Sequence, residues 1–233
     1  MAVLRNIPYY LVRFVCWTIL RIGYDLQVIG QENVPKRGAF IVASNHVSHL
    51  DPVVIGVACP RRVCFLARES LWEHPLMWIF MTAMQCIPIK RGQSDFSALR
   101  EAARRLKSGE RIGLFPEGTR QPSGQLGTAK RGIGLLAAMA RVSVVPAVVV
   151  GTYEALPKGA KGLQHSKIRV AFGPVIPYTD ENSSTAESGG RPSHEPGEAR
   201  TGKAERRVKS NQHDQLAEAV TRQWQRLSAH IRK

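Results

Sequence analysis

The sequence predicts an α/β fold: a largely parallel mixed sheet flanked by helices, with an N-terminal helical segment that lies at a membrane interface. Short apolar runs alternate along the chain with segments of helical period, which is typical of strand–helix–strand units. Several of these runs are continuous and rich in β-branched residues, as expected for strands that helices cover on both faces. The length of 233 residues, with 43% hydrophobic side chains, is enough for one sizeable core.

The first element is an aromatic and aliphatic segment, 3–22, which Arg5, Arg13 and Arg21 interrupt. No uncharged run in it reaches the roughly 20 residues that a spanning helix needs. No small-residue cleavage site follows it, which argues against a signal peptide. An ordinary core helix of a soluble domain is one interpretation. A helix in the headgroup region, with its arginines reaching lipid phosphates, fits the pattern better, so we expect residues 1–24 to lie on a membrane without crossing it.

Strands and helices alternate over residues 25–180, which we expect to form the folded domain. The clearest helix is 94–108, because Ser94 can cap it, Gly109 can end it, and its apolar positions form one stripe. A second helix, 133–140, is apolar all round and should be buried. The predicted strands are 26–30, 39–43, 63–67, 86–89, 112–115, 144–150 and 168–172.

The C-terminal part of the chain divides into two segments. Residues 181–210 contain one Val and no other aliphatic residue larger than Ala. Burial therefore cannot offset the entropy of ordering them, and we predict a disordered linker. In residues 211–233 the apolar side chains Leu216, Val220 and Trp224 recur at helical spacing. This spacing predicts a C-terminal helix that packs on the domain.

The chain is strongly basic, with a formal charge of +15, and residues 1–180 alone carry 23 Lys and Arg against 11 Asp and Glu. Such a domain attracts polyanions in general, including nucleic acid, anionic lipid surfaces, phosphorylated substrates and acidic carrier proteins. A nucleic-acid-binding protein is one alternative, but no recognised nucleic-acid motif is present, and we expect no nucleic acid as partner. The four cysteines form no Cys-x-x-Cys pair, which favours buried free thiols over a zinc site or a disulfide framework.

Two histidines and an aspartate directly follow the predicted strand 39–43, in the motif NHVSHLDP. Ligands of open α/β sheets bind at the carboxyl ends of strands. Pro52 suits the first turn of a new helix, which places Asp51 at its N-cap and can turn the chain so that His46 meets Asp51. An imidazole oriented by a carboxylate can deprotonate a hydroxyl group. Two other interpretations stay open: a metal-dependent hydrolase site that uses His46, His49 and Asp51, and a purely structural turn.

Cationic residues occur in three other motifs. The motif FPEGTR ends in Arg120, whose planar fork of donors suits a phosphate. The motif GTAKRG places Lys130 and Arg131 just before a predicted helix, where an anion can bind. The run IPIKRG puts Arg91 at the end of a strand, on the same edge of the sheet as His46. Each motif alone would be an ordinary surface turn, whereas together they indicate a cationic site beside His46.

The order of these blocks, NHxxxxD, IPxxR, FPEGTR and a Val-Pro strand at 144–147, resembles that of the glycerolipid acyltransferases. It is similar in particular to the 1-acyl-sn-glycerol-3-phosphate acyltransferase family, over about residues 25 to 175. The resemblance implies an enzyme of phospholipid biosynthesis that moves a fatty acyl group from acyl-CoA or acyl-carrier protein to the free hydroxyl of 1-acylglycerol 3-phosphate, giving phosphatidic acid. It implies no metal and no cofactor, and attachment to the cytoplasmic face of the cell membrane through the N-terminal segment.

The resemblance also implies roles for single residues. His46 is expected to be the general base on the acceptor hydroxyl, and Asp51 to orient it and stabilise its positive charge. Gln85 and Lys90 stand where the family often has a glycine and an acidic residue, so another lysophospholipid or a lyso-aminolipid is an alternative acceptor. The residues expected to bind or surround the substrate are Arg91, Glu117, Gly118, Thr119, Arg120 and Lys130.

Overall fold

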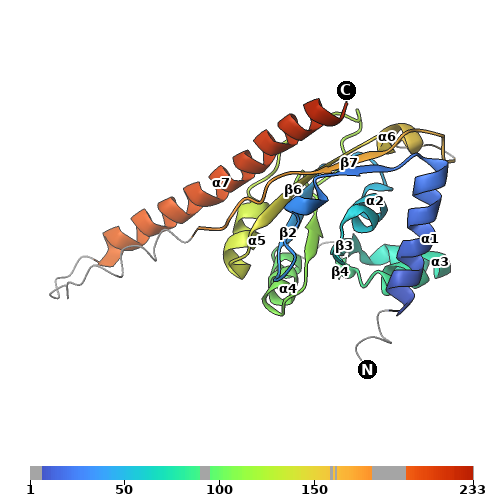
Figure 1. Cartoon of the computed structure of the whole chain (residues 1–233). Helices are drawn as coiled ribbons and strands as arrows, with labels where there is room; N and C mark the ends of the chain where they lie inside the picture. Colours follow the sequence, from blue (N-terminus) through green and yellow to red (C-terminus); the bar gives the residue numbers. More distant parts are fainter. Residues whose placement is uncertain (1–6, 90–94, 158–159, 161, 180–197, 233) are drawn as a thin grey trace.

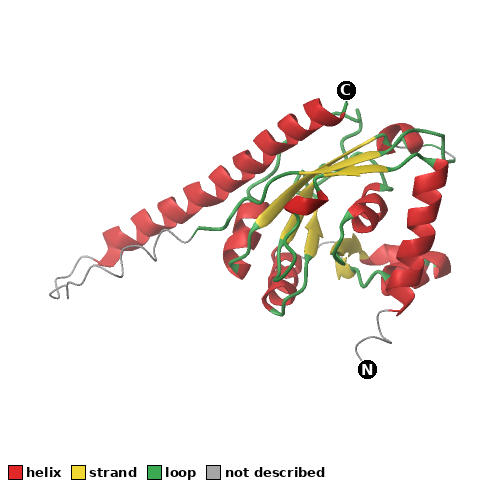
Figure 2. Ribbon diagram, viewed as in Figure 1, coloured by secondary structure: helices red, strands yellow, loops and turns green. Residues whose placement is uncertain are grey.

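The computed structural model describes residues 7–89, 95–157, 160, 162–179 and 198–232, and it confirms the α/β fold and all seven predicted strands (Figures 1 and 2). The strands are β1 (Gln27–Ile29), β2 (Ile41–Ser44), β3 (Cys64–Arg68), β4 (Ile87–Ile89), β5 (Ile112–Leu114), β6 (Val144–Val150) and β7 (Arg169–Phe172). They form one sheet in the order β1-β7-β6-β2-β5-β3-β4. Only β6 and β7 pair in antiparallel fashion among these described strands, so the sheet is mixed and largely parallel, as predicted.

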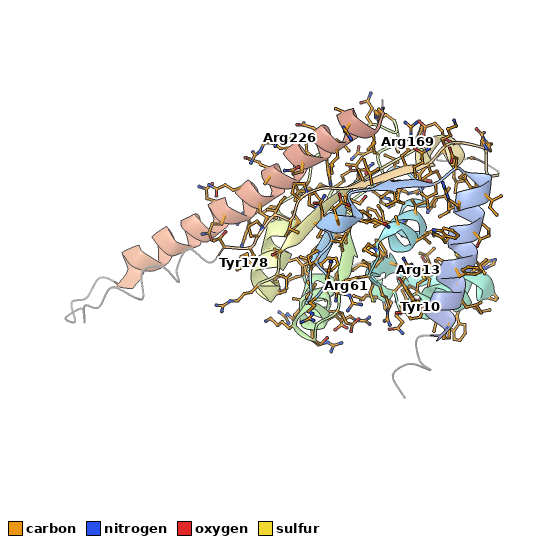
Figure 3. All side chains as sticks on the ribbon, in the orientation of Figure 1. Tyr10, Arg13, Arg61, Arg169, Tyr178 and Arg226 are labelled. Atoms are coloured by element: carbon orange, nitrogen blue, oxygen red, sulfur yellow. The ribbon has the colours of Figure 1, made fainter. Side chains whose placement is uncertain are left out.

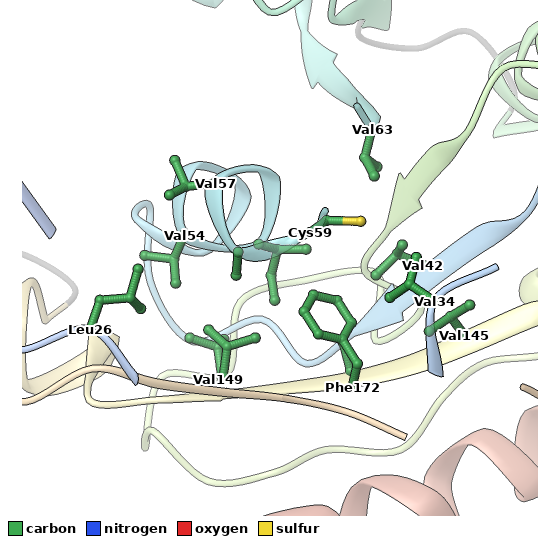
Figure 4. Packing of buried hydrophobic residues seen from close by; sticks show 14 of the residues in the cluster. Leu26, Val34, Val42, Val54, Val57, Cys59, Val63, Val145, Val149 and Phe172 are labelled. Carbon is green, nitrogen blue, oxygen red and sulfur yellow. The ribbon is translucent and has the colours of Figure 1, made fainter. Parts of the chain in front are cut away.

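Helices cover both faces of this sheet (Figure 1). They are α1 (Ile7–Gly23), α2 (Asp51–Ala58), α3 (Pro75–Ala83), α4 (Asp95–Lys107), α5 (Gly132–Ala140), α6 (Thr152–Ala155) and α7 (Glu198–Ile231), with 3₁₀ turns at Gln31–Asn33 and Glu69–Glu73. On one face, Val54 of α2 packs against Val149 of β6 and Phe172 of β7 (Figure 4). On the other face, α4, α5 and α7 pack around the fully buried Leu136 and Trp224. The apolar helix α5 contacts both α4 and α7, which explains why it has no polar face.

The register of the central strands decides which loops meet. Ile41 of β2 pairs with Ile112 of β5 on one side and with Val144 of β6 on the other. Because these strands are parallel, the loops at their carboxyl ends leave the sheet side by side, with the loop after β2 in the middle. The strand β4 lies at the edge of the sheet, and β5 and β3 separate it from β2. The NHVSHLDP and FPEGTR motifs are therefore on neighbouring loops, whereas the IPIKRG motif begins three strand positions away from β2.

The C-terminal helix is longer than predicted. It packs on the domain as expected, because Trp224 is fully buried and its Nε1 donates a hydrogen bond to the carbonyl oxygen of Ala43 in β2 at 2.9 Å. However, α7 begins at Glu198, so 198–210 is helical and the prediction of a linker over 181–210 is wrong for this part. The prediction considered only burial, whereas Ala, Glu, Lys and Arg in this stretch are strong helix formers that can extend a helix already fixed by packing. Residues 180–197 lie outside the described residues.

The N-terminal helix α1 is fixed to the domain by its polar side chains as well as by packing. Arg13 (Figure 3) donates to the carbonyl oxygens of Val57 and Cys59, at 3.1 and 2.9 Å, at the C-terminal end of α2. Arg21 donates to the carbonyl oxygen of Leu26 at 3.0 Å. The expectation that these two arginines reach lipid phosphates is therefore wrong, since both donate to backbone carbonyl groups of the domain. Within the described residues, no helix combines the length and the apolar character needed to span a bilayer.

The contact between α5 and α7 depends on a residue without a side chain. A Cβ atom at Gly134 would lie 2.4 Å from the backbone oxygen of His213 in α7, whereas one at Gly132 would meet no atom within 4 Å. We therefore predict that Gly134→Ala lowers the free energy of unfolding by about 1–3 kcal/mol, because the two helices must move apart. The control Gly132→Ala should be neutral or stabilising by up to about 1 kcal/mol. Urea denaturation measures both values, and equal stability of the two variants would contradict the close packing.

Candidate active site

The side chains of His46 and Asp51 are in contact at the carboxyl end of β2. Nδ1 of His46 lies 2.8 Å from Oδ2 of Asp51. The same oxygen accepts hydrogen bonds from the backbone amides of Val47 and Ser48, at 2.7 and 2.8 Å. Asp51 is completely buried. It is the first residue of α2, and the N-cap is Leu50, one position earlier than the predicted N-cap at Asp51. One buried carboxylate oxygen therefore holds both the imidazole and the backbone of the turn.

This arrangement leaves the other nitrogen of the ring for chemistry. A carboxylate oxygen that accepts a hydrogen bond from Nδ1 requires the tautomer with the proton on Nδ1, in which Nε2 has a free lone pair. The side chain of His46 is 20% exposed, so a substrate can approach its ring. The side chain of Asp51 is fully shielded from water. The pair can take a proton from a hydroxyl group.

Two neighbours fix the turn to the sheet. The side-chain amide of Asn45 donates to the carbonyl oxygen of Val149 at 3.0 Å and accepts from the amide of Val149 at 2.8 Å. The hydroxyl of Ser48 donates to the carbonyl oxygen of Leu156 at 3.0 Å. Because Asn45 and Ser48 are buried, these bonds are made without competition from water. They tie the NHVSHLDP segment to β6 and to the residue that follows α6.

An aromatic stack fixes the plane of the imidazole. The ring of Phe115 lies parallel to that of His46, with the centroids 4.2 Å apart and an angle of 20° between the planes. Phe65 of β3 stacks on the other side, with a centroid distance of 5.7 Å to Phe115. Gly113 leaves the space that the Phe65 ring fills, because a Cβ atom there would come within 2.2 Å of that ring. This stack was not predicted from the sequence, although a glycine inside an apolar strand is a signal of close approach by another group.

The loop after β5 is joined to the backbone of His46. The amide of Gln121 donates to the carbonyl oxygen of His46 at 2.8 Å. Glu117 is buried, its Oε1 accepts the amide of Gly127 at 3.3 Å, and its Oε2 has no hydrogen-bond partner among the described residues. Burial raises the pKa of Glu117, and hydrogen bonding by Gly127, with smaller effects of Gln121 and His46, acts in the opposite direction. The side chain of Glu117 is thus shielded from solvent.

Two predicted cationic residues, Arg120 and Lys130, belong to this same loop between β5 and α5. Gly118 has φ of +77°, and a Cβ atom there would lie 3.1 Å from Nζ of Lys130, so the lysine side chain passes over this glycine. The amide of Lys130 donates to the carbonyl oxygen of Pro116 at 2.8 Å. Gly118, Thr119 and Lys130 are exposed, and Arg120 is half-buried. Neither Arg120 nor Lys130 pairs with a carboxylate within the part of the chain that the structure describes, which leaves both cations to bind an anion.

Arg91 lies outside the described residues. The last residue before it whose backbone is described, Ile89, ends the edge strand β4. The structure therefore brings together the other site residues predicted from the sequence, His46, Asp51, Glu117, Gly118, Thr119, Arg120 and Lys130, on the loops after β2 and β5 and before α5. In the described ranges, no three His, Cys, Asp or Glu side chains are grouped in a way that could hold a metal ion.

The chain is similar to known acyltransferases. A family model described as Acyltransferase matches residues 25–150. The chloroplastic 1-acyl-sn-glycerol-3-phosphate acyltransferase LPAT1 of Arabidopsis thaliana is 32% identical over 151 residues, which are 63% of this chain and 42% of that protein. The 1-acyl-sn-glycerol-3-phosphate acyltransferase of Bacillus subtilis is 27% identical and covers 70% of this chain and 79% of its own length. The chain thus spans less than half the length of the Arabidopsis relative.

A solved structure extends the likeness to three dimensions. The crystal structure of the 1-acyl-sn-glycerophosphate acyltransferase PlsC from Thermotoga maritima superposes with a TM-score of 0.61 at 28% identity, over 75% of this chain and 72% of that one. The residues that the family model matches, 25–150, include both members of the His46–Asp51 contact.

We predict that Glu117→Gln makes stability less dependent on pH. Between the ordinary pKa of a glutamate and the raised pKa of Glu117, the unfolded chain loses its proton before the folded one, so the free energy of unfolding of the wild type falls as pH rises. Glutamine keeps an oxygen for the Gly127 amide but carries no charge, so this fall should disappear in the variant. Urea denaturation at a series of pH values measures the free energy of unfolding. Identical pH profiles of the wild type and the variant would show that burial does not raise the pKa of Glu117.

Proposed function

The chain belongs to the acyltransferase family, beside the 1-acyl-sn-glycerol-3-phosphate acyltransferases, and on this premise we propose that it transfers a fatty acyl group to the free hydroxyl of 1-acylglycerol 3-phosphate. The donor is acyl-CoA or acyl-carrier protein, and the product is phosphatidic acid for phospholipid synthesis. The observation that carries the proposal is the 2.8 Å contact between His46 and Asp51, next to the loop that bears Arg120 and Lys130. A base beside a cationic loop suits a substrate with a hydroxyl group and a phosphate.

The proposed reaction uses His46 first as a base and then as an acid. Nε2 accepts the proton of the acceptor hydroxyl while the hydroxyl oxygen attacks the thioester carbonyl of the donor. Asp51 stabilises the imidazolium that forms. The new C–O bond replaces the C–S bond, and the thiolate that leaves takes the proton back from Nε2. The stack of Phe115 on His46 supports this role, because it keeps Nε2 pointing in one direction throughout.

Arg120 and Lys130 are proposed to bind the phosphate of the acceptor. An arginine guanidinium and a lysine ammonium on the same loop can both form strong charge-assisted hydrogen bonds with phosphate oxygens. Gly118 and Thr119, which precede Arg120, are exposed and leave the backbone of the loop open to the ligand. Arg91 is proposed to join this site from the loop after β4. The reaction is proposed to need no metal and no cofactor.

The protein is also proposed to bind the cytoplasmic face of the cell membrane through α1. The outer side of this helix exposes large apolar side chains, and α3, which contacts α1, exposes Trp78 and Ile79. The net charge of +15 favours an anionic lipid surface. The exposed apolar side chains of α1 are Tyr10, Leu11, Phe14, Val15, Trp17, Ile19 and Ile22. A helix with these properties lies in the interface with its apolar side in the lipid.

The base assignment predicts that His46→Ala lowers the rate of phosphatidic acid formation by about 10²–10⁴-fold. The control His49→Ala removes an exposed imidazole from the same segment and should leave the rate close to that of the wild type. Purified protein is incubated with lysophosphatidic acid and with acyl-CoA or acyl-carrier protein, and the product is identified by its mass.

Near-normal turnover of His46→Ala, with its circular dichroism unchanged, would refute the assignment. The same assay is expected to proceed at an unchanged rate in the presence of EDTA. Loss of activity with the chelator would instead favour the metal-dependent hydrolase alternative.

The membrane proposal predicts that Phe14→Asp weakens binding to vesicles at least about tenfold, because burial of one Phe side chain contributes roughly 2–3 kcal/mol. Phe14 on α1 is 64% exposed. The matched control is Phe96→Asp on α4, on the opposite face of the sheet, where the side chain is 45% exposed. Sedimentation with phosphatidylcholine–phosphatidylglycerol vesicles measures the bound fraction. Equal loss in both variants, or in neither, would show that α1 is not the membrane-binding surface.

A further inference from the structure

A side chain of the C-terminal helix binds the loop that carries Lys130. The backbone amide of Ala129 donates a hydrogen bond to Oγ1 of Thr221 in α7 at 3.0 Å. The same hydroxyl donates its proton to the carbonyl oxygen of Ala217, one turn earlier in the helix, also at 3.0 Å. The hydroxyl proton is thus used within α7, and a lone pair of the oxygen is directed to the loop. Thr221 therefore acts as an acceptor in a defined orientation.

The helix that presents Thr221 is held rigidly against the domain. Trp224, one turn after Thr221, is fully buried and its indole donates to the carbonyl oxygen of Ala43 in β2. In the other direction along α7, the backbone of His213 rests directly on Gly134 of α5. Because α7 is fixed on both sides of Thr221, the position of the hydroxyl is set by the core and does not depend on the loop.

The loop is held at the residue next to Ala129 as well. The amide of Lys130 donates to Pro116, and the Lys130 side chain passes over Gly118. Two consecutive amides thus bind different parts of the protein, one in α7 and the other in the FPEGTR loop. With both bonds in place, the backbone from which the Lys130 ammonium extends has little freedom to rotate.

We infer that Thr221 is a positioning residue, which holds the Ala129–Lys130 backbone so that the Lys130 ammonium stays over the FPEGTR loop, where it meets the acceptor phosphate. This inference rests on the proposed function. It also gives α7 a part in the site, although the helix lies beyond residues 25–150, which the family model matches. Thr221 does not touch substrate; it acts through the position of Lys130.

The test is a comparison of KM and kcat for Thr221 variants with lysophosphatidic acid. Thr221→Val keeps the shape of the side chain and removes the hydroxyl acceptor. Thr221→Ala also removes the acceptor and leaves a smaller side chain. Both are expected to raise KM by about three- to tenfold, in line with the loss of one hydrogen bond, and to leave kcat within about twofold. Thr221→Ser, which keeps the hydroxyl, should restore KM. Gln225→Ala, an exposed position of the same helix, is the control and should change neither value.

A double-mutant cycle with Lys130→Ala separates positioning from general damage. If Thr221 acts through Lys130, adding Thr221→Val to Lys130→Ala raises KM no further. An unchanged KM in both single Thr221 variants, or an equal rise with and without Lys130, would overturn the inference while leaving the wild-type activity in place. Absence of phosphatidic acid formation by the wild type would instead overturn the proposed function, and the two failures are therefore distinct.

Discussion

The site depends on one buried oxygen atom, Oδ2 of Asp51, which lies within hydrogen-bond distance of His46 Nδ1 and accepts the amides of Val47 and Ser48. Three bonds to one oxygen close the turn between β2 and α2, and they orient the imidazole by the same contact that shapes the backbone. Removal of this carboxylate would leave two buried amides without an acceptor, which costs about 1–3 kcal/mol for each buried group. The proposed catalytic geometry and the local fold therefore depend on the same interaction. The parallel sheet adds the second requirement, because it places the FPEGTR loop beside this turn.

Charges of opposite sign are separated by depth in this site. The carboxylates of Asp51 and Glu117 are buried, whereas Lys130 is exposed and Arg120 is half-buried. Under the proposed function, an exposed cation above buried carboxylates suits a substrate that carries a phosphate. The long helix α7 binds the loop that carries Lys130 through Thr221, and the apolar side of α1 is the surface proposed to meet the lipid.

Features that arise from neighbouring residues in the chain were predictable, and features that arise from distant ones were not. The short apolar runs, several of them rich in β-branched residues, predict all seven strands, and Pro52 after a strand predicts the turn that joins His46 to Asp51. The stack of Phe65, Phe115 and His46 joins three loops or strands, and no spacing in the sequence indicates it. The carbonyl partners of Arg13, 44 and 46 residues away, could not be read from a helical pattern either. The true start of α7 was missed because a helix can extend past the residues whose burial stabilises it.

The measurement that tests the central claim most directly is the acyl-transfer rate of Asp51→Asn. The amide has nearly the shape of the carboxylate, but it cannot stabilise the positive charge that His46 gains when it takes a proton. The account predicts that the variant folds, binds lysophosphatidic acid with little change in KM, and loses about 10²–10⁴-fold in kcat. A folded variant that forms phosphatidic acid at the wild-type rate would show that the contact between residues 46 and 51 serves the fold alone.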